Sequence, residues 1–211
     1  MFVVWVIWWK KYKGEKMLKE VTIEKVEANE YPHFVKTQLV TAYRGKQKLK
    51  WEMIVAYDSV HIIVFDISTK EFLLVKQVRI PVLVNDASSK GEVYEACAGL
   101  VDKKTSIKQI AKEEVLEELG YDVDIKNIHF IKTLKSAVGI SGREAHTFYA
   151  EVTSTDKVSD GGGIDAEDIE VVKVHISKIK EWMYSDKITT DAITLFLINY
   201  YFDLIKRDKI I

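Results

Sequence analysis

The pattern of apolar and polar positions predicts β-strands through the first half of the chain. Residues 60–65 and 72–78 are aliphatic runs separated by the polar stretch 66–71, which is typical of two strands joined by a turn. The other predicted strands are shorter or alternate in polarity: 21–26, 34–43, 51–57, 92–97, 128–134, 146–152 and 169–175. A turn at 44–46 separates two of them, and an acidic, glycine-rich loop at about 153–168 precedes the last one.

The predicted helices cover 106–119, 179–184 and 191–205. The first is the clearest, because Ser106 and Gln109 have the form of a capping box and Gly120 suits a C-terminal cap. The second is weak, and the third is apolar almost all round. Strands mixed with two or three helices, without strict strand–helix alternation, predict an α+β fold.

Composition indicates an ordinary globular protein. The 211 residues are 47% hydrophobic and 30% charged, which suits one domain with a small appendage. A net charge of −1 gives no electrostatic reason to expect binding to nucleic acid or to an anionic membrane. The single cysteine, Cys97, excludes an intramolecular disulfide and fits a reducing compartment, so we expect a cytoplasmic protein.

The chain starts with an apolar run, residues 1–9, followed by Lys10, Lys11 and Lys13. This run is too short for a transmembrane helix, which needs about 20 residues. A secretion signal would carry its positive charges before the apolar run. An extra edge strand and sequence upstream of a true start at Met17 are the two interpretations. We therefore treat residues 1–16 as an extension of doubtful origin with no role at a membrane.

Four glutamates crowd the end of the first predicted helix: Glu113, Glu114, Glu117 and Glu118. Like charges four residues apart cost a helix roughly 0.2–0.5 kcal/mol per pair, and the negative end of the helix dipole adds repulsion. A helical wheel places Glu114 and Glu118 in the apolar arc, and the basic residues near in sequence are few, Lys112 and Lys126. A divalent cation would relieve both the repulsion and the burial, and Mg²⁺ prefers carboxylate ligands. A solvated acidic face is the alternative.

The segment from Gly99 to Gly120 resembles the Nudix box, the loop–helix–loop of hydrolases that cleave nucleoside diphosphates linked to another moiety. The matching positions, at the correct spacing, are Gly99, Glu114, Val115, Glu117, Glu118 and Gly120. Thr105 stands where the family has a Glu, and Glu113 stands where it has an Arg. In the family these two positions usually pair with each other. The chain therefore lacks both partners of one structural contact, which puts the support of the loop in question, while keeping the metal glutamates.

The resemblance extends from about Gln38 to the C-terminal region. The segments KLKWEMIVAYDSVHIIVFD, LVKQVRIPV, EACAGLVD, SAVGISGREAHTFYAEV and GGGIDAEDIEVVKVHI follow the order found in the Nudix branch that acts on ADP-ribose and UDP-glucose. The resemblance implies a Nudix α/β/α sandwich with a mixed sheet at 59–211. It also implies a small antiparallel β portion at 17–58 that serves for dimerisation.

The resemblance also implies a metal site and a catalytic base. Glu114 and Glu118 would be the principal ligands of Mg²⁺, or alternatively of Mn²⁺, with Glu117 and the backbone carbonyl of Ala98 contributing, and Glu118 counts as catalytic too. In this branch the base often lies on a flexible loop near the C-terminal side, where the candidates are Asp165, Glu167, Asp168 and Glu170. We favour Glu167, which immediately precedes the opening of the last strand, with Asp165 next. A mobile, solvated loop is the alternative.

Substrate contacts follow in the same way. Arg79 is implied to hold a substrate phosphate, and chemistry supports this independently, because the fixed fork of an Arg matches phosphate in a way that Lys cannot copy. Arg143, in a loop with two glycines, is a second phosphate or sugar contact. Trp51 and Tyr43 are candidates for stacking on the base. The alternative roles are a surface salt bridge for Arg79 and core or interface packing for the aromatic residues.

The implied activity is Mg²⁺-dependent hydrolysis of a nucleotide sugar, of the UDP-glucose or ADP-ribose type, to a nucleoside monophosphate and a sugar phosphate. The implied protein is a homodimer with a nucleotide-sugar substrate and no nucleic-acid or membrane partner. One alternative is a Nudix hydrolase of a dinucleoside polyphosphate, a flavin nucleotide or NADH. The other is a catalytically silent nucleotide-sugar sensor, which is supported by the departures at Thr105 and Glu113 and opposed by the retained glutamates.

Overall fold

The computed structural model describes residues 19, 22, 24, 35–164 and 167–208. The extension at 1–16, nearly all of the predicted strand at 21–26, and Asp165 lie outside the described residues. The strands are β1 (Lys36–Arg44), β2 (Gln47–Val55), β3 (Ser59–Asp66), β4 (Glu71–Val78), β5 (Glu92–Glu95), β6 (Cys97–Leu100), β7 (Ile128–Ser136), β8 (Arg143–Val152) and β9 (Glu170–His175). The α-helices are α1 (Ile80–Asn85), α2 (Ile107–Glu114), α3 (Ile179–Met183) and α4 (Ala192–Asp208), with short 3₁₀ helices at Ala87–Ser89, Ile125–Asn127 and Ser154–Asp156.

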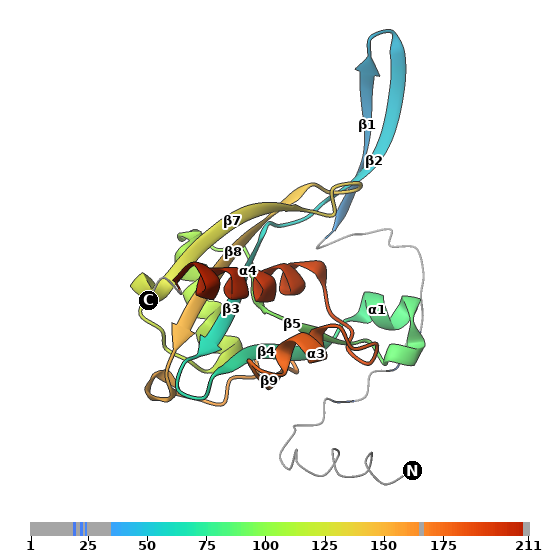
Figure 1. Cartoon of the computed structure of the whole chain (residues 1–211). Coiled ribbons are helices and arrows are strands. Elements are labelled where there is room, and N and C mark those ends of the chain that lie inside the picture. The colour runs from blue at the N-terminus through green and yellow to red at the C-terminus, as the bar shows by residue number, and fades with distance from the viewer. Residues whose placement is uncertain (1–18, 20–21, 23, 25–34, 165–166, 209–211) are drawn as a thin grey trace.

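A mixed, seven-stranded sheet forms the body of the protein, in the order β5-β4-β3-β8-β7, with β6 also paired to β3 and β9 to β4. The pair β3–β8 is parallel and the other pairs are antiparallel. Helices lie on both faces of this sheet (Figure 1). The predictions of an α+β fold and of a sandwich with a mixed sheet are therefore confirmed.

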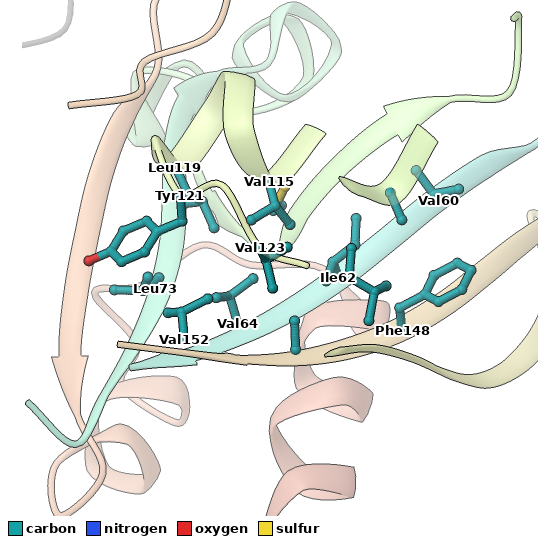
Figure 2. Packing of buried hydrophobic residues seen from close by; sticks show 14 of the residues in the cluster. Val60, Ile62, Val64, Leu73, Val115, Leu119, Tyr121, Val123, Phe148 and Val152 are labelled. Carbon is teal, nitrogen blue, oxygen red and sulfur yellow. The ribbon is translucent and has the colours of Figure 1, made fainter. Parts of the chain in front are cut away.

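The alternation of side chains along β3 builds two cores. Val60, Ile62 and Val64 point to the face covered by α2, whereas Ile63 and Phe65 point to the face covered by α3 and α4. Figure 2 shows the first core, where β3 packs beneath the end of the α2 segment. Both faces of β3 are buried, which explains why its sequence is a continuous aliphatic run rather than an alternating one.

The hairpin β1–β2 forms a separate two-stranded sheet and projects from the body (Figure 1). Its register runs from Lys36 opposite Val55 to Arg44 opposite Gln47, and nearly all of its residues are exposed. It touches the β7–β8 turn, where the amide of Ile54 donates to the carbonyl of Ile140 at 2.7 Å.

Two local predictions need correction. The run 92–97 is two short strands rather than one, because the chain leaves β4 after Glu95 and joins β3 at Cys97. Helix α1 was not predicted, since its sequence, IPVLVN, reads as an extended run. Pro81 lies in the first turn of this helix, where its missing N–H costs nothing, and none of the α1 residues is buried.

The divergence of β3 from β4 creates the place for a site. These strands pair only where Val64–Asp66 face Glu71–Leu73. Beyond that point, residues 59–62 of β3 pair with β6, and the end of β4 pairs with β5. The segment 92–100 thus crosses from one diverging strand to the other. Among the described residues, no helix is both long and apolar enough to span a membrane.

Candidate active site

Helix α2 is set by its two ends. At its start, Ser106 Oγ accepts a hydrogen bond from the Gln109 amide at 3.1 Å, so half of the predicted capping box forms. The Gln109 side chain donates instead to Glu113 at 3.1 Å. After Glu114 the helix widens into one π-helical turn, Val115–Leu119, and it stops at Gly120 in the left-handed conformation, as predicted.

Glu118 is the most deeply buried glutamate of the cluster, with 3% of its surface exposed. Its Oε2 accepts a hydrogen bond from the amide of Ala98 at 2.9 Å, and the Cys97 thiol is a second partner. Burial raises the pKa of Glu118 to about 8 despite these hydrogen bonds, and the charges of Glu114 and Glu167 act in the same direction.

Glu114 lies over Gly99, so close that a Cβ at residue 99 would collide with its carboxylate. Burial, and then the charge of Glu117, raise the pKa of Glu114 to about 7. No hydrogen bond or ion pair joins Glu114 to any residue that the structure describes. The glycine of the box is therefore needed to admit a carboxylate that has no bonded partner among the described residues.

These carboxylates fit a hard divalent cation. Glu114 and Glu118 are adjacent, largely buried and acidic, and the Ala98 backbone passes beside them. Lys112 does not compensate them, because its ammonium pairs with Asp122 at 2.9 Å. An oxygen-only set of closely spaced carboxyl groups is the environment that Mg²⁺ and Mn²⁺ occupy in proteins.

The glycine-rich loop packs against the C-terminal end of the π-helical turn. The amide of Gly162 donates to the Glu118 carbonyl at 2.9 Å, and that of Gly163 donates to the Glu117 carbonyl at 3.1 Å. Gly161, at φ +67°, lies so near the Glu118 carbonyl that no Cβ could be accommodated. The loop thus caps the helix and is held beside the glutamates.

Of the loop acids, Glu167 acts on the glutamate cluster. Its charge raises the pKa values of Glu114 and Glu118, and its Oε2 accepts a hydrogen bond from the Ile164 amide at 3.1 Å. Asp168 instead accepts a hydrogen bond from the Lys19 amide at 2.8 Å, and Glu170 forms an ion pair with a lysine of β4 at 3.4 Å. The structure therefore brings Glu167 together with the glutamates.

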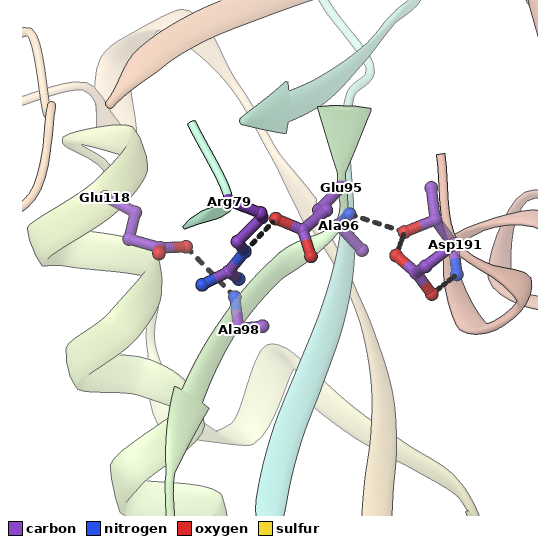
Figure 3. Close-up of polar contacts among 7 residues, drawn as sticks. Arg79, Glu95, Ala96, Ala98, Glu118 and Asp191 are labelled. Atoms are coloured by element: carbon purple, nitrogen blue, oxygen red, sulfur yellow. Dashed lines mark hydrogen bonds and ion pairs between the residues drawn. The ribbon is translucent and has the colours of Figure 1, made fainter. Parts of the chain in front are cut away.

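Arg79 is held from one side only. Its Nε donates to Glu95 Oε2 at 2.8 Å, and none of the described residues bonds its terminal nitrogens. The exposed end of the fork is thus available to a phosphate. Figure 3 shows how three contacts follow one another along residues 95–98: Arg79 to Glu95, the Ala96 amide to Thr194 Oγ1 at 2.8 Å, and the Ala98 amide to Glu118.

Arg143 lies at the start of β8, where its Nη1 donates to the carbonyl of Tyr57 at 3.4 Å. The charges of Arg143 and Arg79 both lower the pKa of His61 of β3, although burial is the main cause of its shift. Trp51 is different. Its side chain is 62% exposed on the projecting hairpin, and its Nε1 donates to the Gly139 carbonyl at 2.9 Å.

Comparisons with known proteins identify the family of the chain. No family model matches the chain. The GDP-mannose pyrophosphatase of Salmonella arizonae is 35% identical over 139 residues, covering 66% of this chain and 70% of that protein. The uridine diphosphate glucose pyrophosphatase NUDT14 of Bos taurus is 29% identical over 201 residues, covering 82% of this chain and 90% of that protein. The chain belongs to the Nudix nucleotide-sugar hydrolases.

A solved structure supports the fold of this Nudix hydrolase. The crystal structure of an ADP compounds hydrolase superposes with a TM-score of 0.67 at 16% identity, covering 92% of this chain and 98% of that one. The fold of this chain, with its mixed sheet and its small two-stranded sheet, is thus that of a known hydrolase structure. Together with the two sequence relatives, this match confirms the resemblance to the Nudix family that the segment from Gly99 to Gly120 carries.

The departures from the Nudix box have a structural counterpart. Lys103, in the box loop, forms ion pairs with Glu113 at 2.9 Å and with Glu117 at 3.9 Å. An ion pair thus links the loop to the helix, with the charges reversed from those of the family. The loop supplies the cation, Lys103, two residues before Thr105, and the helix supplies the carboxylate, Glu113. Lys112 and Lys126 pair instead with Asp122 and Asp124, and Lys103 becomes a neighbour of Glu113 because the loop folds back.

The sequence did not indicate two polar features near the site. One is His61, and the other is a group formed by Asp58, Glu144 and His146, whose potential ligand atoms lie within 4.8 Å of one another. The parallel pairing of β3 with β8 brings these distant residues together, so no spacing in the sequence could reveal them. The second group is already compensated, because Lys135 contacts Glu144 at 2.8 Å.

Proposed function

We propose that this Nudix hydrolase cleaves the pyrophosphate bond of a nucleotide sugar and releases a nucleoside monophosphate and a sugar phosphate. The observation that carries the proposal is that one short segment, residues 95–98, holds Arg79 at one end and Glu118 at the other, with Glu114 lying over the next residue, Gly99. Metal carboxylates and a phosphate-binding arginine are the two requirements of pyrophosphate hydrolysis. The relatives named for UDP-glucose and GDP-mannose support the substrate class.

The residues that would hold the cation are Glu114, Glu118 and Glu117, together with the Ala98 carbonyl. We propose Mg²⁺, with Mn²⁺ as the substitute, because all of these donors are oxygens. When bound, such an ion supplies neutralisation of phosphate charge and a water of lowered pKa.

The chain's own groups complete the reaction. Arg79 and Arg143 hold the phosphate oxygens and orient one phosphorus for attack. Glu167 accepts a proton from the attacking water as its oxygen bonds to that phosphorus. The bridging P–O bond breaks, and its electron pair leaves with the other phosphate.

We also propose that residues 17–58 form a dimerisation unit and that the reaction takes place in the cytoplasm. The hairpin β1–β2 exposes large apolar side chains, namely Leu39, Val40, Tyr43, Trp51 and Val55. A two-stranded hairpin is marginally stable alone, and an exposed apolar surface of this kind is typical of an interface. A second copy would bury this surface and bring Trp51 to a site where it stacks on the base.

The test is product analysis with Mg²⁺ and a panel of UDP-glucose, GDP-mannose, ADP-ribose, NADH and a diadenosine polyphosphate. We expect a monophosphate and a sugar phosphate from at least one nucleotide sugar, with a loss of at least about 100-fold in Glu114→Gln. Glu181→Gln is the matched control, because Glu181 is an exposed residue of α3. Full turnover in Glu114→Gln would exclude the assigned metal ligands. Turnover of NADH or the dinucleotide alone would exclude the substrate class.

A further inference from the structure

His61 lies where β3 and β4 have separated. It is paired in register with Ala98 of β6, and its side chain points to the same sheet face as Ser59, the face that α4 covers. This is the opposite face from that of Val60 and Ile62, which pack beneath α2. The ring is therefore on β3 directly beside the segment that links Arg79 to Glu118, yet it contributes to neither core.

The strands around His61 place two arginines near it. Arg79 is held to Glu95, three residues before Ala98, the register partner of His61, and Arg143 begins β8, which pairs in parallel with β3. The charge of Asp191, which precedes α4, also acts on the ring. The carboxylate of Asp191 is already engaged as a helix cap, since it accepts hydrogen bonds from the amides of Ile193 at 2.6 Å and Thr194 at 3.0 Å. The two arginines are the groups around His61 with donors to spare.

The two ring nitrogens of His61 have different surroundings. Its Nε2 lies 2.9 Å from Ser59 Oγ, a largely buried hydroxyl. No described residue bonds Nδ1. A histidine so held, on a rigid strand, presents its second nitrogen in a defined direction.

We propose that His61 binds the substrate directly, by donating a hydrogen bond from Nδ1–H to a pyrophosphate oxygen held between Arg79 and Arg143, and that the Ser59 hydroxyl fixes this tautomer by donating to Nε2. The inference rests on the proposed function and adds a third substrate-binding donor to its two arginines.

A neutral ring suits this role. A ring whose Nε2 accepts a hydrogen bond from Ser59 keeps one N–H donor, at Nδ1, and adds no third positive charge beside two guanidinium groups. A hydrogen bond between a neutral donor and a charged phosphate is among the stronger kinds in proteins.

The experiment compares His61→Ala, His61→Asn, His61→Gln and Ser59→Ala with wild type. Calorimetry measures binding of UDP, GDP and ADP in Mg²⁺, and kinetics measure KM and kcat on whichever nucleotide sugar wild type hydrolyses. The Asn amide reaches the position of Nδ1, whereas the Gln amide reaches that of Nε2. Thermal melting of each variant reports any loss of packing.

We expect His61→Ala and His61→Gln to weaken nucleoside diphosphate binding and raise KM by about 10- to 100-fold. In both variants kcat should stay within about threefold of wild type, because the contact exists before the transition state. His61→Asn should recover most of the affinity, and Ser59→Ala should lose about threefold through the freed tautomer.

Unchanged binding in His61→Ala would overturn the inference. An equal loss of nucleotide affinity in all three His61 variants, together with lower melting temperatures, would also overturn it, since that pattern indicates that His61 acts only through packing. Failure of wild type to bind any of the three nucleotides would overturn it as well. If wild type binds them with the expected dependence on His61 but hydrolyses no nucleotide sugar, the contact stands and the proposed function is wrong.

Discussion

Glu118 should make the metal-free protein less stable as the pH rises. Its carboxyl is 3% exposed and has a pKa of about 8 in the folded chain, against an ordinary value of 4.5. The folded state therefore holds this proton more tightly than the unfolded state does. The stabilisation is fully present below pH 4.5, declines as the unfolded chain ionises, and is lost once the pH passes about 8.

The size of the effect follows from the two pKa values. At 1.36 kcal/mol per pH unit, the difference corresponds to about 5 kcal/mol, of which about 4 kcal/mol is lost between pH 5 and pH 9. Glu118→Gln keeps an acceptor for the Ala98 amide and cannot ionise. Between pH 5 and pH 9 the variant should therefore keep several kcal/mol of unfolding free energy that wild type loses. At pH 9 the variant should be the more stable protein.

Urea unfolding in EDTA, from pH 5 to pH 9, measures this difference. Glu114 titrates in both proteins, so subtracting the two curves isolates Glu118 and its coupling to Glu114. Excess Mg²⁺ should reverse the order by stabilising wild type alone. Parallel loss of stability in wild type and Glu118→Gln would refute the reasoning, because it would show that Glu118 is already ionised without cost.

Three further predictions concern neighbouring groups. Arg79→Lys keeps the charge but loses the fork, so KM should rise about tenfold with a small change in kcat. Gly161→Ala should lower the free energy of unfolding by at least about 2 kcal/mol, because the new Cβ would collide with backbone atoms at a positive φ. Gly142→Ala also has a positive φ but has open space around it, so it should lower the free energy of unfolding by only about 1 kcal/mol. Urea titration of the two variants measures the difference. Glu167→Gln should reduce kcat by about 10²- to 10⁴-fold with Mg²⁺ affinity retained, whereas Asp168→Asn should keep most activity; a metal titration of turnover separates the two.

The fold was predictable where the local pattern and the burial agree. The aliphatic runs at 60–65 and 72–78 became β3 and β4 with nearly the expected bounds, because both faces of these strands are buried. Helix α2 was predictable from Ser106 and Gly120, which end it in the expected way. The sequence of α1 gave no such sign, because its apolar residues pack into no core and only the proline in its first turn favours a helix.

The acidic half of the candidate site was predictable because it lies on one helix. Helical spacing alone brings Glu114 and Glu118 to one side, and their repulsion already pointed to a cation. Lys103 and His61 were not predictable in the same way. Lys103 reaches Glu113 through the fold of the box loop, and the parallel pairing of β3 with β8 brings the strand of His61 beside the strand that begins with Arg143.

The two halves of the site are joined by extended backbone rather than by a loop. Arg79 is fixed at Glu95, and Glu118 is fixed at the Ala98 amide, three residues further along the same segment, or about 10 Å of extended chain. The α4 helix fixes the middle of this span, because Thr194 accepts the Ala96 amide. The segment is also paired to both diverging strands, so it can shift only if the sheet shifts. The distance between the phosphate-binding and metal-binding groups is therefore a property of the sheet.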